Sequence, residues 1–412
     1  MHPLDLSIKD FSYNLPEEKI ARFPLAERDQ SKLLIYNNGY IRKDIYKNIA
    51  GYLPENAMLV FNDTRVIEAR LLFQKTSGGI IEIFALEPHG QYPDITTAMH
   101  SCGKVWWKCL IGGAGKWKHG QILTKQITEN DYTIQLSARI VERLPDSFTI
   151  EFAWFPVSLN FAKILHRFGV MPIPPYLKRE TAMSDNERYQ TIYGIAAGSV
   201  AAPTAGLHFT GNIFNSLDSK NIQSAFLTLH VGAGTFMPVK SETLSGHHMH
   251  AEFMQVEISF IQKLINRPGD VFAVGTTSLR TLESLYWMGV KCATNHSISL
   301  EELEIKQWEV YEQLEEHMIP AERAFTSLLN WMERNELPVL IIKTSILIAP
   351  PYRSKLVRGL ITNFHQPNST LLLLVAAMIG EEWTKVYEYA LENDFRFLSY
   401  GDGCLLFNRY EV

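Results

Sequence analysis

The stretch SGHHMHAEFMQVEI, residues 245–258, concentrates side chains that could do chemistry. If it forms a β-strand, successive side chains alternate between faces, so His248, His250 and Glu252 share one face. Two imidazoles and a carboxylate could bind a metal ion, move protons or simply form a polar surface. A metal site needs more ligands than these. Three further histidines could supply them: His208, His230 and His365.

Polar side chains also follow four apolar runs that are typical of strands. These runs are AMLVFN, SAFLTL, DVFAVG and GLIT, and the residues after them are Asp63, His230, Thr276 with Thr277, and Asn363 with His365. In open α/β sheets, ligands bind beyond the carboxyl ends of strands. Each position alone is readily explained as a cap or turn, but the four together predict a site.

The segment GTTSLRTLESL combines a small-residue turn with the start of a helix, for which Thr277 or Ser278 is a plausible N-cap. The unpaired N–H groups of such a turn attract an anion. Arg280 could add a bidentate contact to a carboxylate or phosphate. An equally good reading is a capped helix in which Arg280 pairs with an acid such as Glu283.

Three other motifs are less informative. The segment AAPTAGLHFTGNIF places small residues around His208, which suits close approach of a ligand, although a tight packed turn is the safer reading. HVGAGTF is not a dinucleotide-binding fingerprint, because Met237 stands at the third glycine position and no helix obviously follows. IGGAGKWKHG is not a phosphate loop, because Leu110 replaces its first glycine.

The segment KVWWKCLIGGAGKWKHG interleaves basic and aromatic residues, a combination that can hold an RNA backbone and stack a base. Its members are Lys104, Lys108, Lys116 and Lys118 with Trp106, Trp107 and Trp117. The alternative is a barrel core beneath a solvated, charged hairpin, which is at least as good for Trp106 and Trp107.

The elements around these residues predict an α/β protein. Residues 66–152 hold short β-rich runs separated by turn residues, which is typical of a small antiparallel β-barrel. Before and after them, apolar strands alternate with helical segments, which predicts a mainly parallel sheet built from residues 1–65 and 153–412. The barrel then appears as an insertion, and residues 288–341 form a second, acidic insertion within the α/β domain.

Bulk properties favour a cytoplasmic protein. The 412 residues carry a formal net charge of −5, which gives no global attraction for nucleic acid but leaves room for a local basic patch. The four cysteines form no C-x-x-C pair, so a disulfide framework or cysteine zinc site is not expected. The N-terminal residues lack the apolar core of a signal peptide, and the longest apolar run is about half a membrane span.

Taken together, ten blocks in order resemble the S-adenosylmethionine:tRNA ribosyltransferase-isomerase family of queuosine biosynthesis. They are YNLPEEKIARFPLAERDQSKLL, LVFNDTRVIEARL, RFGVMPIPPYLKRE, ERYQTIYG, AAPTAGLHFT, HVGAGTFMPV, HHMHAE, GTTSLRTLESL, GLITNFHQPNSTLLLLVAAMIG and FRFLSYGDGCLL. The resemblance implies an α/β domain interrupted by a β-barrel. It also implies transfer and rearrangement of the ribosyl group of S-adenosylmethionine onto the aminomethyl group of a 7-deazaguanine at the wobble position of tRNA. S-adenosylmethionine is then a consumed cosubstrate, adenine and methionine leave, and no metal is expected.

The chemistry of that reaction suggests roles for the candidate residues. A base must remove a proton from the ribose carbon next to the sulfonium, and the departing adenine needs an acid. Histidines that titrate near neutrality suit these steps. The proton-handling candidates are His208, His230, His250 and His365, with Glu252 and Asp63 as orienting or accepting groups. The substrate-binding candidates are Arg65, Thr204, Gly232, Gly234, His248, Thr276, Thr277, Arg280, Asn363, Thr370 and Asp402, the last for ribose hydroxyls. The RNA-binding candidates are Lys104, Lys108, Lys116, Lys118 and Trp117.

The chain departs from the family pattern in loops and in the acidic insertion. Residues 301–316 hold seven Glu and one Lys, which would repel a phosphate backbone, so we expect this segment to face away from tRNA, as a lid or a subunit contact. Pro351 stands where the family pattern has glycine. These changes keep three alternatives open: a paralogue with another acceptor, a silent RNA- or nucleotide-binding protein, and a metal hydrolase built on HHMHAE.

Overall fold

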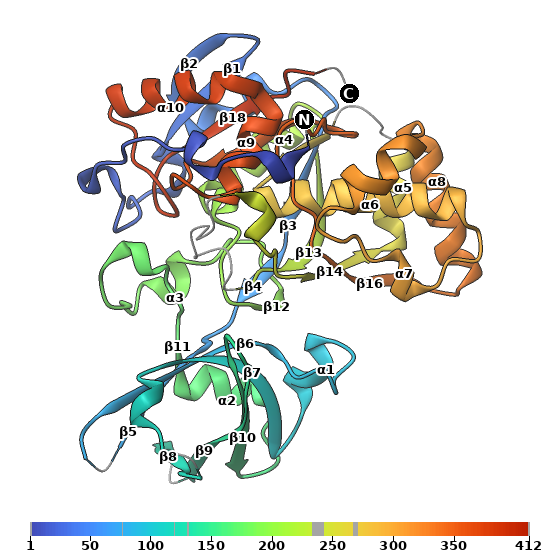
Figure 1. The fold of residues 1–412 in the computed structure, drawn as a ribbon. Helices are drawn as coiled ribbons and strands as arrows, with labels where there is room; N and C mark the ends of the chain where they lie inside the picture. The colour runs from blue at the N-terminus through green and yellow to red at the C-terminus, as the bar shows by residue number, and fades with distance from the viewer. Residues whose placement is uncertain are drawn as a thin grey trace.

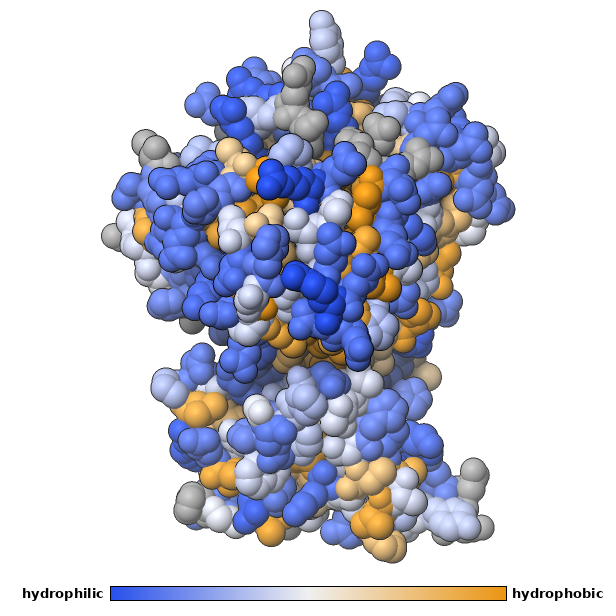
Figure 2. Space-filling model, turned by 90° about the vertical axis from the view of Figure 1, so that its right-hand side faces the viewer, coloured by the Kyte–Doolittle hydropathy of each residue, from blue (hydrophilic) through white to orange (hydrophobic). Residues whose placement is uncertain are grey.

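The computed structural model describes residues 2–75, 77–118, 120–129, 132–232, 243–266 and 271–410. Two large sheets form the molecule (Figure 1). Seen from the side, a broad upper part and a smaller lower part meet at a narrower waist, and hydrophilic residues dominate this face (Figure 2). No helix in the described part of the chain combines the length and apolar character needed to cross a membrane.

Nine strands form the upper sheet, in the order β16-β14-β13-β3-β15-β17-β18-β1-β2. Their bounds are β1 Lys32–Asn37, β2 Tyr40–Ile45, β3 Met58–Asn62, β13 Gln223–His230, β14 Glu252–Glu257, β15 Val271–Val274, β16 Val339–Thr344, β17 Val357–Asn363 and β18 Gly403–Phe407. The central four, β13-β3-β15-β17, are parallel. The four central carboxyl ends therefore meet at one edge of the sheet.

The sheet is mixed, so the prediction of a mainly parallel sheet holds only for its centre. β14 and β16 pair antiparallel on one side, and β18 pairs antiparallel with β17 on the other. β1 and β2 are antiparallel because a two-residue turn joins them, with Asn38 and Gly39 both at positive φ. That Asn-Gly turn is a hairpin signal in the sequence.

Helices cover both faces of this sheet. Successive residues of β3 alternate between two cores: Met58 and Val60 pack in the core that contains α6, and Leu59 and Phe61 in the core that contains α4. The helices are α4 Gly211–Asp218, α5 Ile258–Asn266, α6 Thr276–Thr294, α7 Leu300–Leu303, α8 Ala321–Arg334, α9 Thr370–Ile379 and α10 Trp383–Glu392. Burial on both faces explains the continuous apolar runs of the central strands.

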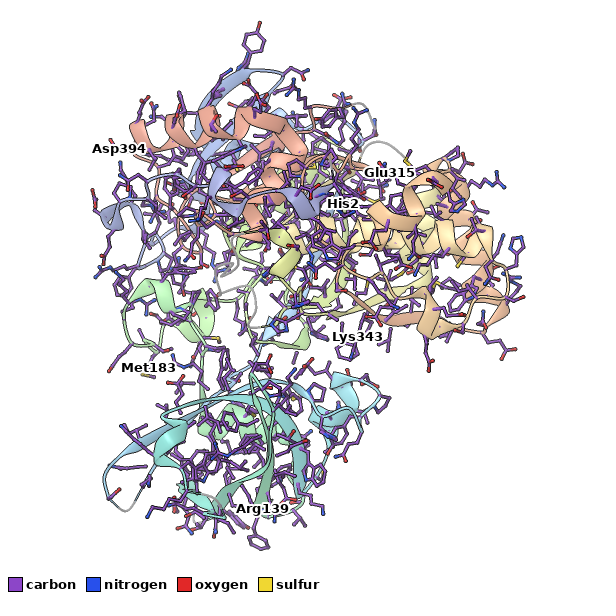
Figure 3. The ribbon with its side chains drawn as sticks, in the orientation of Figure 1. His2, Arg139, Met183, Glu315, Lys343 and Asp394 are labelled. Atoms are coloured by element: carbon purple, nitrogen blue, oxygen red, sulfur yellow. The ribbon has the colours of Figure 1, made fainter. Side chains whose placement is uncertain are left out.

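The acidic segment, residues 301–316, is part of the same fold. Lys291 of α6 forms an ion pair with Glu309 at 2.6 Å, and its ammonium group donates to the carbonyls of Glu302 and Glu304. His2 contacts the rings of Trp308 and Tyr311, and Figure 3 shows the N-terminal His2 close to Glu315. The segment is anchored to the α/β core, and its placement relative to tRNA stays a prediction.

Seven antiparallel strands form the lower sheet, in the order β11-β5-β6-β7-β10-β9-β8. Their bounds are β5 Arg70–Gln74, β6 Ile80–Pro88, β7 Lys104–Gly112, β8 Leu123–Glu129, β9 Tyr132–Arg143, β10 Phe148–Phe155 and β11 Gly169–Val170. β5 contacts β8, so the sheet curls into a half-barrel, with α2 Phe161–Phe168 packed in its core. The antiparallel class was predicted correctly, but β11 and α2 lie beyond residue 152. The domain limits themselves stay a prediction.

A short parallel ribbon lies between the two sheets (Figure 1). It pairs β4 Thr64–Val66 with β12 Ala196–Ser199. Two short helices lie between β4 and β12 in the sequence: α1 Ile95–His100 and α3 Asp185–Arg188. α1 contacts β12, so the half-barrel side of the molecule touches the short ribbon of β4 and β12.

Candidate functional site

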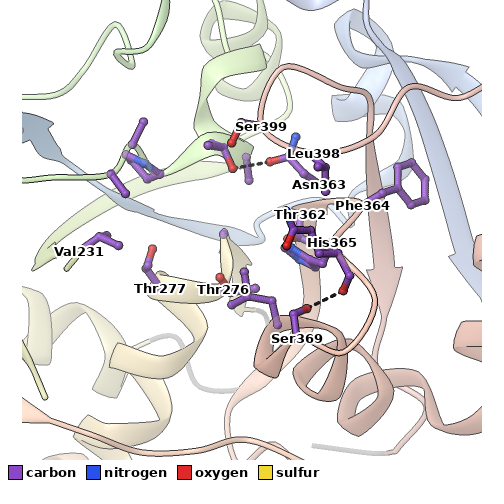
Figure 4. Close-up of a pocket in the computed structure, with 18 of the residues that line it drawn as sticks. Val231, Thr276, Thr277, Thr362, Asn363, Phe364, His365, Ser369, Leu398 and Ser399 are labelled. Carbon is purple, nitrogen blue, oxygen red and sulfur yellow. Dashed lines mark hydrogen bonds between the residues drawn. The ribbon is translucent and has the colours of Figure 1, made fainter. Parts of the chain in front are cut away.

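A pocket opens at the carboxyl ends of the parallel strands (Figure 4). It is lined by Tyr176, Tyr189, residues 201–205, Val231, Gly275, Thr276, Thr277, residues 362–366, Ser369, Leu371, Leu398 and Ser399. Segments after β13, β15 and β17 all contribute. The sequence prediction of a site at these strand ends is therefore matched by a cavity. Asp63, after β3, is absent from the lining.

The first turn of α6 forms one wall of this pocket. Gly275 is the N-cap residue with φ 93°, a conformation that favours glycine, and no side chain among the described residues caps the turn. The predicted N-cap at Thr277 or Ser278 is wrong, because the helix already begins at Thr276. The free N–H groups and the positive end of the helix dipole therefore border the pocket. Figure 4 shows Thr276 and Thr277 at this helix start.

His365 lies in the pocket wall after β17. Its Nε2 is 2.9 Å from Thr362 Oγ1, its backbone N–H donates to Tyr387 Oη, and its carbonyl accepts from Tyr13 Oη. Burial lowers the pKa of His365 to about 3. The imidazole is therefore neutral at pH 7 and held by the backbone on both sides.

His208 lies behind Asn363, on the 3-10 helix Thr204–His208. Asn363 Nδ2 is 3.3 Å from His208 Nε2, and Thr204 Oγ1 donates to Asn363 Oδ1 at 2.7 Å. The His208 ring stacks on Tyr46, with ring centroids 4.2 Å apart, and its Nδ1 is 3.4 Å from the Arg28 carbonyl. These contacts favour the Nδ1–H tautomer, with Nε2 accepting from Asn363. Burial lowers the pKa of His208 to about 3.

His230, at the end of β13, points toward the β4–β12 ribbon. Its Nδ1 is 3.0 Å from Thr64 Oγ1, which in turn lies 2.7 Å from Ser199 Oγ. Burial lowers the pKa of His230 to about 4. The expectation that these histidines titrate near neutrality is wrong for His208, His230 and His365, because burial penalises the charged imidazolium.

The three buried histidines predict a loss of stability in acid. Each pKa falls from 6.5 in the unfolded chain to about 3 or 4 in the folded protein, so below pH 6.5 the unfolded state binds more protons. Stability should therefore fall as pH falls from about 6.5 toward 3, by about 2 kcal/mol per histidine at pH 5. Urea unfolding at pH 7 and pH 5 measures this.

Carboxylates also titrate in that range, so the readout is the difference between the protein and its His365→Gln variant. The variant should lose less stability between pH 7 and pH 5 than the unchanged protein. Equal losses would show that His365 is not the neutral, buried group that its surroundings indicate.

Glu252 and Arg280 pair with each other. Arg280 Nη1 donates to Glu252 Oε2, Arg280 Nε donates to the Ile346 carbonyl at 3.2 Å, and the Gly232 N–H donates to Glu252 Oε1. The proposed pairing of Arg280 with Glu283 is wrong, because the Glu283 carboxylate accepts from Tyr352, Ser354 and the Lys355 backbone. Arg280 is buried and neutralised, so it offers little charge to an incoming anion.

The His248 and His250 stretch is not a strand. β14 begins only at Glu252, and the backbone just before it is hydrogen-bonded to the side chain of Gln307. Its Oε1 accepts from the Met249 N–H and its Nε2 donates to the His247 carbonyl. His248 and His250 are exposed. Among the described residues, no group of three or more His, Cys, Asp or Glu side chains is placed to hold a metal ion.

Other substrate-binding candidates lie outside the pocket. Asp402 is buried, and its carboxylate accepts from the backbone N–H groups of Lys32 and Arg396 and from the Arg396 side chain. It already accepts three hydrogen bonds and is absent from the lining of the pocket, so it is not placed to bind a ribose there. Arg65 is exposed on β4, and Thr370 is the first residue of α9. Gly234 lies outside the described residues.

Asp63 lies beside β13 instead of in the pocket. Its carboxylate accepts from Thr228 Oγ1 at 2.6 Å, and burial raises its pKa.

The RNA-binding candidates have three different surroundings in the structure. Trp117 is wrong as a stacking platform, because it is buried in the half-barrel core and its Nε1 donates to the Gln121 carbonyl. Lys108 pairs with Glu87 at 3.0 Å. Lys104, Lys116 and Lys118 are exposed and stay predictions.

Several pocket residues were not predicted. Tyr176 Oη lies 2.5 Å from Ser399 Oγ, and the buried Tyr189 hydroxyl has no hydrogen-bond partner among the described residues. Gln366 and Ser369 complete the polar lining. These residues stand inside the blocks PIPPYLKRE, ERYQTIYG, FHQPNST and FRFLSYGDG. Neither their charge nor their spacing identified these residues as members of a site. The blocks that contain them were noted only for their resemblance to the family.

Fold and pocket define an α/β protein with a pocket at the carboxyl ends of its parallel strands, the place where ligands bind in open α/β sheets. The model of the queuosine biosynthesis protein family matches residues 8–406. The chain belongs to this family.

Similar proteins named S-adenosylmethionine:tRNA ribosyltransferase-isomerase include one from Legionella pneumophila, 36% identical over 97% of this chain and 99% of that protein. Another, from Pelobacter propionicus, is 35% identical over 97% of this chain and 99% of its own length. The crystal structure of an S-adenosylmethionine tRNA ribosyltransferase from Thermotoga maritima is 27% identical, covers 96% of this chain and 99% of that chain, and has a TM-score of 0.43.

Proposed function

We propose that this protein is an S-adenosylmethionine-dependent tRNA ribosyltransferase-isomerase. It transfers and isomerises the ribosyl group of S-adenosylmethionine onto the aminomethyl group of 7-aminomethyl-7-deazaguanine at the wobble position of tRNA. The products are epoxyqueuosine-tRNA, adenine and methionine. The observation that carries this proposal is the match to relatives of that name along nearly the whole length of both chains.

The strand-end pocket is the candidate donor site. Its described lining combines hydroxyls, amides and apolar groups, and none of these described residues is Asp, Glu, Lys or Arg. Such a surface suits the uncharged adenosine portion of S-adenosylmethionine. The α6 N-terminus supplies hydrogen-bond donors to it.

We assign proton transfer within this site to His365. Its imidazole is neutral and lines the pocket, so it can accept the proton from the ribose carbon next to the sulfonium. The neutral imidazole can act as an acid toward the departing adenine only after it has accepted that proton. His208 acts through Asn363, which it orients. We assign no proton transfer to His230, His250, Glu252 or Asp63, because none of them lines the pocket.

The acceptor tRNA requires a cationic surface beyond the pocket. The exposed Lys104, Lys116 and Lys118 of the half-barrel are candidates for phosphate contacts, without a Trp117 stack. In this arrangement, residues 66–152 form a tRNA-facing insertion, and residues 1–65 with 153–412 form the catalytic domain. The acidic residues 301–316 would face away from the RNA.

A turnover assay tests the proposal. The protein is incubated with S-adenosylmethionine and with tRNA that bears the aminomethyl-deazaguanine, and unmodified tRNA is the control. We expect free adenine together with the mass gain of an epoxycyclopentane on the modified nucleoside. Adenine release without that gain would point to another acceptor. Donor binding without adenine release would contradict the proposed enzyme and favour a silent binding protein.

A further inference from the structure

A second, smaller pocket adjoins the first at Ser399, which lines both. Its polar lining comes from Arg28, Ser31, Arg188, His208, Ser399 and Tyr400. Arg28 begins the 3-10 helix Arg28–Gln30, and Arg188 ends α3, so two segments far apart in the chain each bring one guanidinium to it. This pocket is therefore cationic, whereas the described residues that line the donor pocket beside it include no Asp, Glu, Lys or Arg.

The two arginines connect their segments through hydrogen bonds to backbone carbonyls, which carry no charge. Arg28 donates to the carbonyls of Gln190 at 2.6 Å and Glu187 at 2.8 Å. Arg188 donates to the carbonyls of Ala26 and Leu25. Among the described residues, neither guanidinium forms an ion pair with a carboxylate. Five other arginines with limited exposure do so: Arg70, Arg167, Arg179, Arg280 and Arg396.

The acids near this pocket are committed elsewhere or exposed. Asp185 accepts from both Arg179 and Tyr400, and Asp29 accepts from Thr210 Oγ1. Glu187 compensates part of the charge, but its side chain is exposed. Two positive charges are thus left facing one pocket without a carboxylate between them.

Two further observations point to a missing anion. The Arg188 Nε is buried and has no hydrogen-bond partner among the described residues. Burial first, and then the charge of Arg188, lowers the pKa of Arg28. An oxyanion in the pocket would relieve both, because a guanidinium binds carboxylate or phosphate through several N–H donors at once.

We infer that Arg28 and Arg188 bind an oxyanion of one of the substrates in this pocket. The inference rests on the proposed function. The oxyanion has two possible sources: the methionine carboxylate of S-adenosylmethionine, which would place its adenosine portion in the adjoining pocket, or a phosphate of the tRNA. Arg28 and Arg188 thereby take the anion-binding role that the sequence suggested for Arg280, whose charge Glu252 neutralises.

The anion site is tested first with inorganic phosphate. The thermal unfolding midpoint is measured against phosphate concentration, with chloride keeping the ionic strength constant. We expect phosphate to stabilise the protein and its Arg188→Lys variant, which keeps the charge. It should not stabilise Arg188→Gln, which keeps an amide donor for the carbonyls. Arg22→Gln is the matched control, because Arg22 is an exposed arginine that pairs with Glu17. Equal phosphate effects in the protein and in Arg188→Gln would overturn the inference.

Should Arg188→Gln fail to fold, Arg188→Lys still decides the question. Lysine cannot reproduce the bidentate fork, so its apparent phosphate affinity should be several-fold weaker than that of the unchanged protein. An unchanged affinity would contradict the inference.

Binding of the two substrates identifies the source of the oxyanion. At least tenfold weaker S-adenosylmethionine binding by Arg188→Gln, with unchanged tRNA affinity, would assign the carboxylate. Weaker tRNA binding, with a salt dependence reduced by about one phosphate contact, would assign the RNA backbone. Unchanged affinity for both substrates would overturn the assignment. A failure of the proposed function is separate, because it appears as absent adenine release by the unchanged protein.

Discussion

Replacing Glu252 by Ala should lower the free energy of unfolding by about 3–5 kcal/mol. Both partners of the Glu252–Arg280 pair are buried, with side-chain exposures of 7% and 9%. Removing the carboxylate leaves the Arg280 charge inside the protein with only the Ile346 carbonyl as partner. Breaking such a pair costs more than the pair itself contributes, because the remaining charge stays desolvated. Urea denaturation at pH 7 measures the loss.

Double replacement separates a stranded charge from a general packing defect. The variant with both Glu252→Met and Arg280→Met should recover most of the stability, because two apolar side chains leave no buried charge. Glu17→Ala is the control for an exposed pair, since Glu17 and Arg22 are both about half exposed, and it should cost far less stability than Glu252→Ala. A Glu252→Ala protein as stable as Glu17→Ala would contradict the buried pair.

The Glu252–Arg280 pair also supports a wall of the proposed donor site. Glu252 Oε1 accepts the Gly232 N–H, which directly follows the pocket residue Val231. Losing Glu252 should therefore loosen the wall formed after β13 as well as the fold. We expect Glu252→Ala to weaken S-adenosylmethionine binding even at temperatures where the variant is still folded.

Replacing His365 by Gln should reduce the rate of adenine release by about 100- to 10,000-fold, the usual range for losing a positioned base. Glutamine is close in size and can keep the contact with Thr362, but its amide cannot accept the ribose proton. Single-turnover assays with saturating S-adenosylmethionine and modified tRNA report the chemical step. The urea midpoint at pH 7 checks that the fold is retained.

His250→Gln is the matched control for this prediction. His250 is exposed and lies outside the pocket lining, so its replacement should leave adenine release within about threefold of the unchanged protein. A His365→Gln enzyme that is as active as His250→Gln would remove His365 from the chemistry. Strong loss in His250→Gln alone would return proton handling to the HHMHAE stretch.

The strand ends were the part of the site that local sequence could locate. The apolar runs of β3, β15 and β17 are almost wholly buried, and each run ends where a polar residue or a small-residue turn begins. This pattern is visible without knowing the partners of the strand. Strand order was not visible in that way. Only the pairing of β13, β3, β15 and β17 brings Val231, Gly275 and Asn363 to one edge.

Side-chain environment was the part that local sequence missed. The residues next to Trp117 in the chain are compatible both with stacking on a base and with packing in a core. In the folded protein, Trp117 packs in the core of the curled half-barrel. The HHMHAE stretch alternates like a strand, yet Gln307, about sixty residues later, takes its backbone groups.

Sequence by itself determined the family of this protein, its α/β class, its antiparallel part and the strand ends that border the pocket. These follow from local patterns and from the order of motifs along one chain. Tertiary structure alone decided which ionisable groups are charged. His208 meets Asn363 across 155 positions, and Glu252 neutralises Arg280 while Arg28 and Arg188 meet without a carboxylate. Charge and protonation depend on burial and on distant partners, and neither is encoded in the spacing of neighbouring residues.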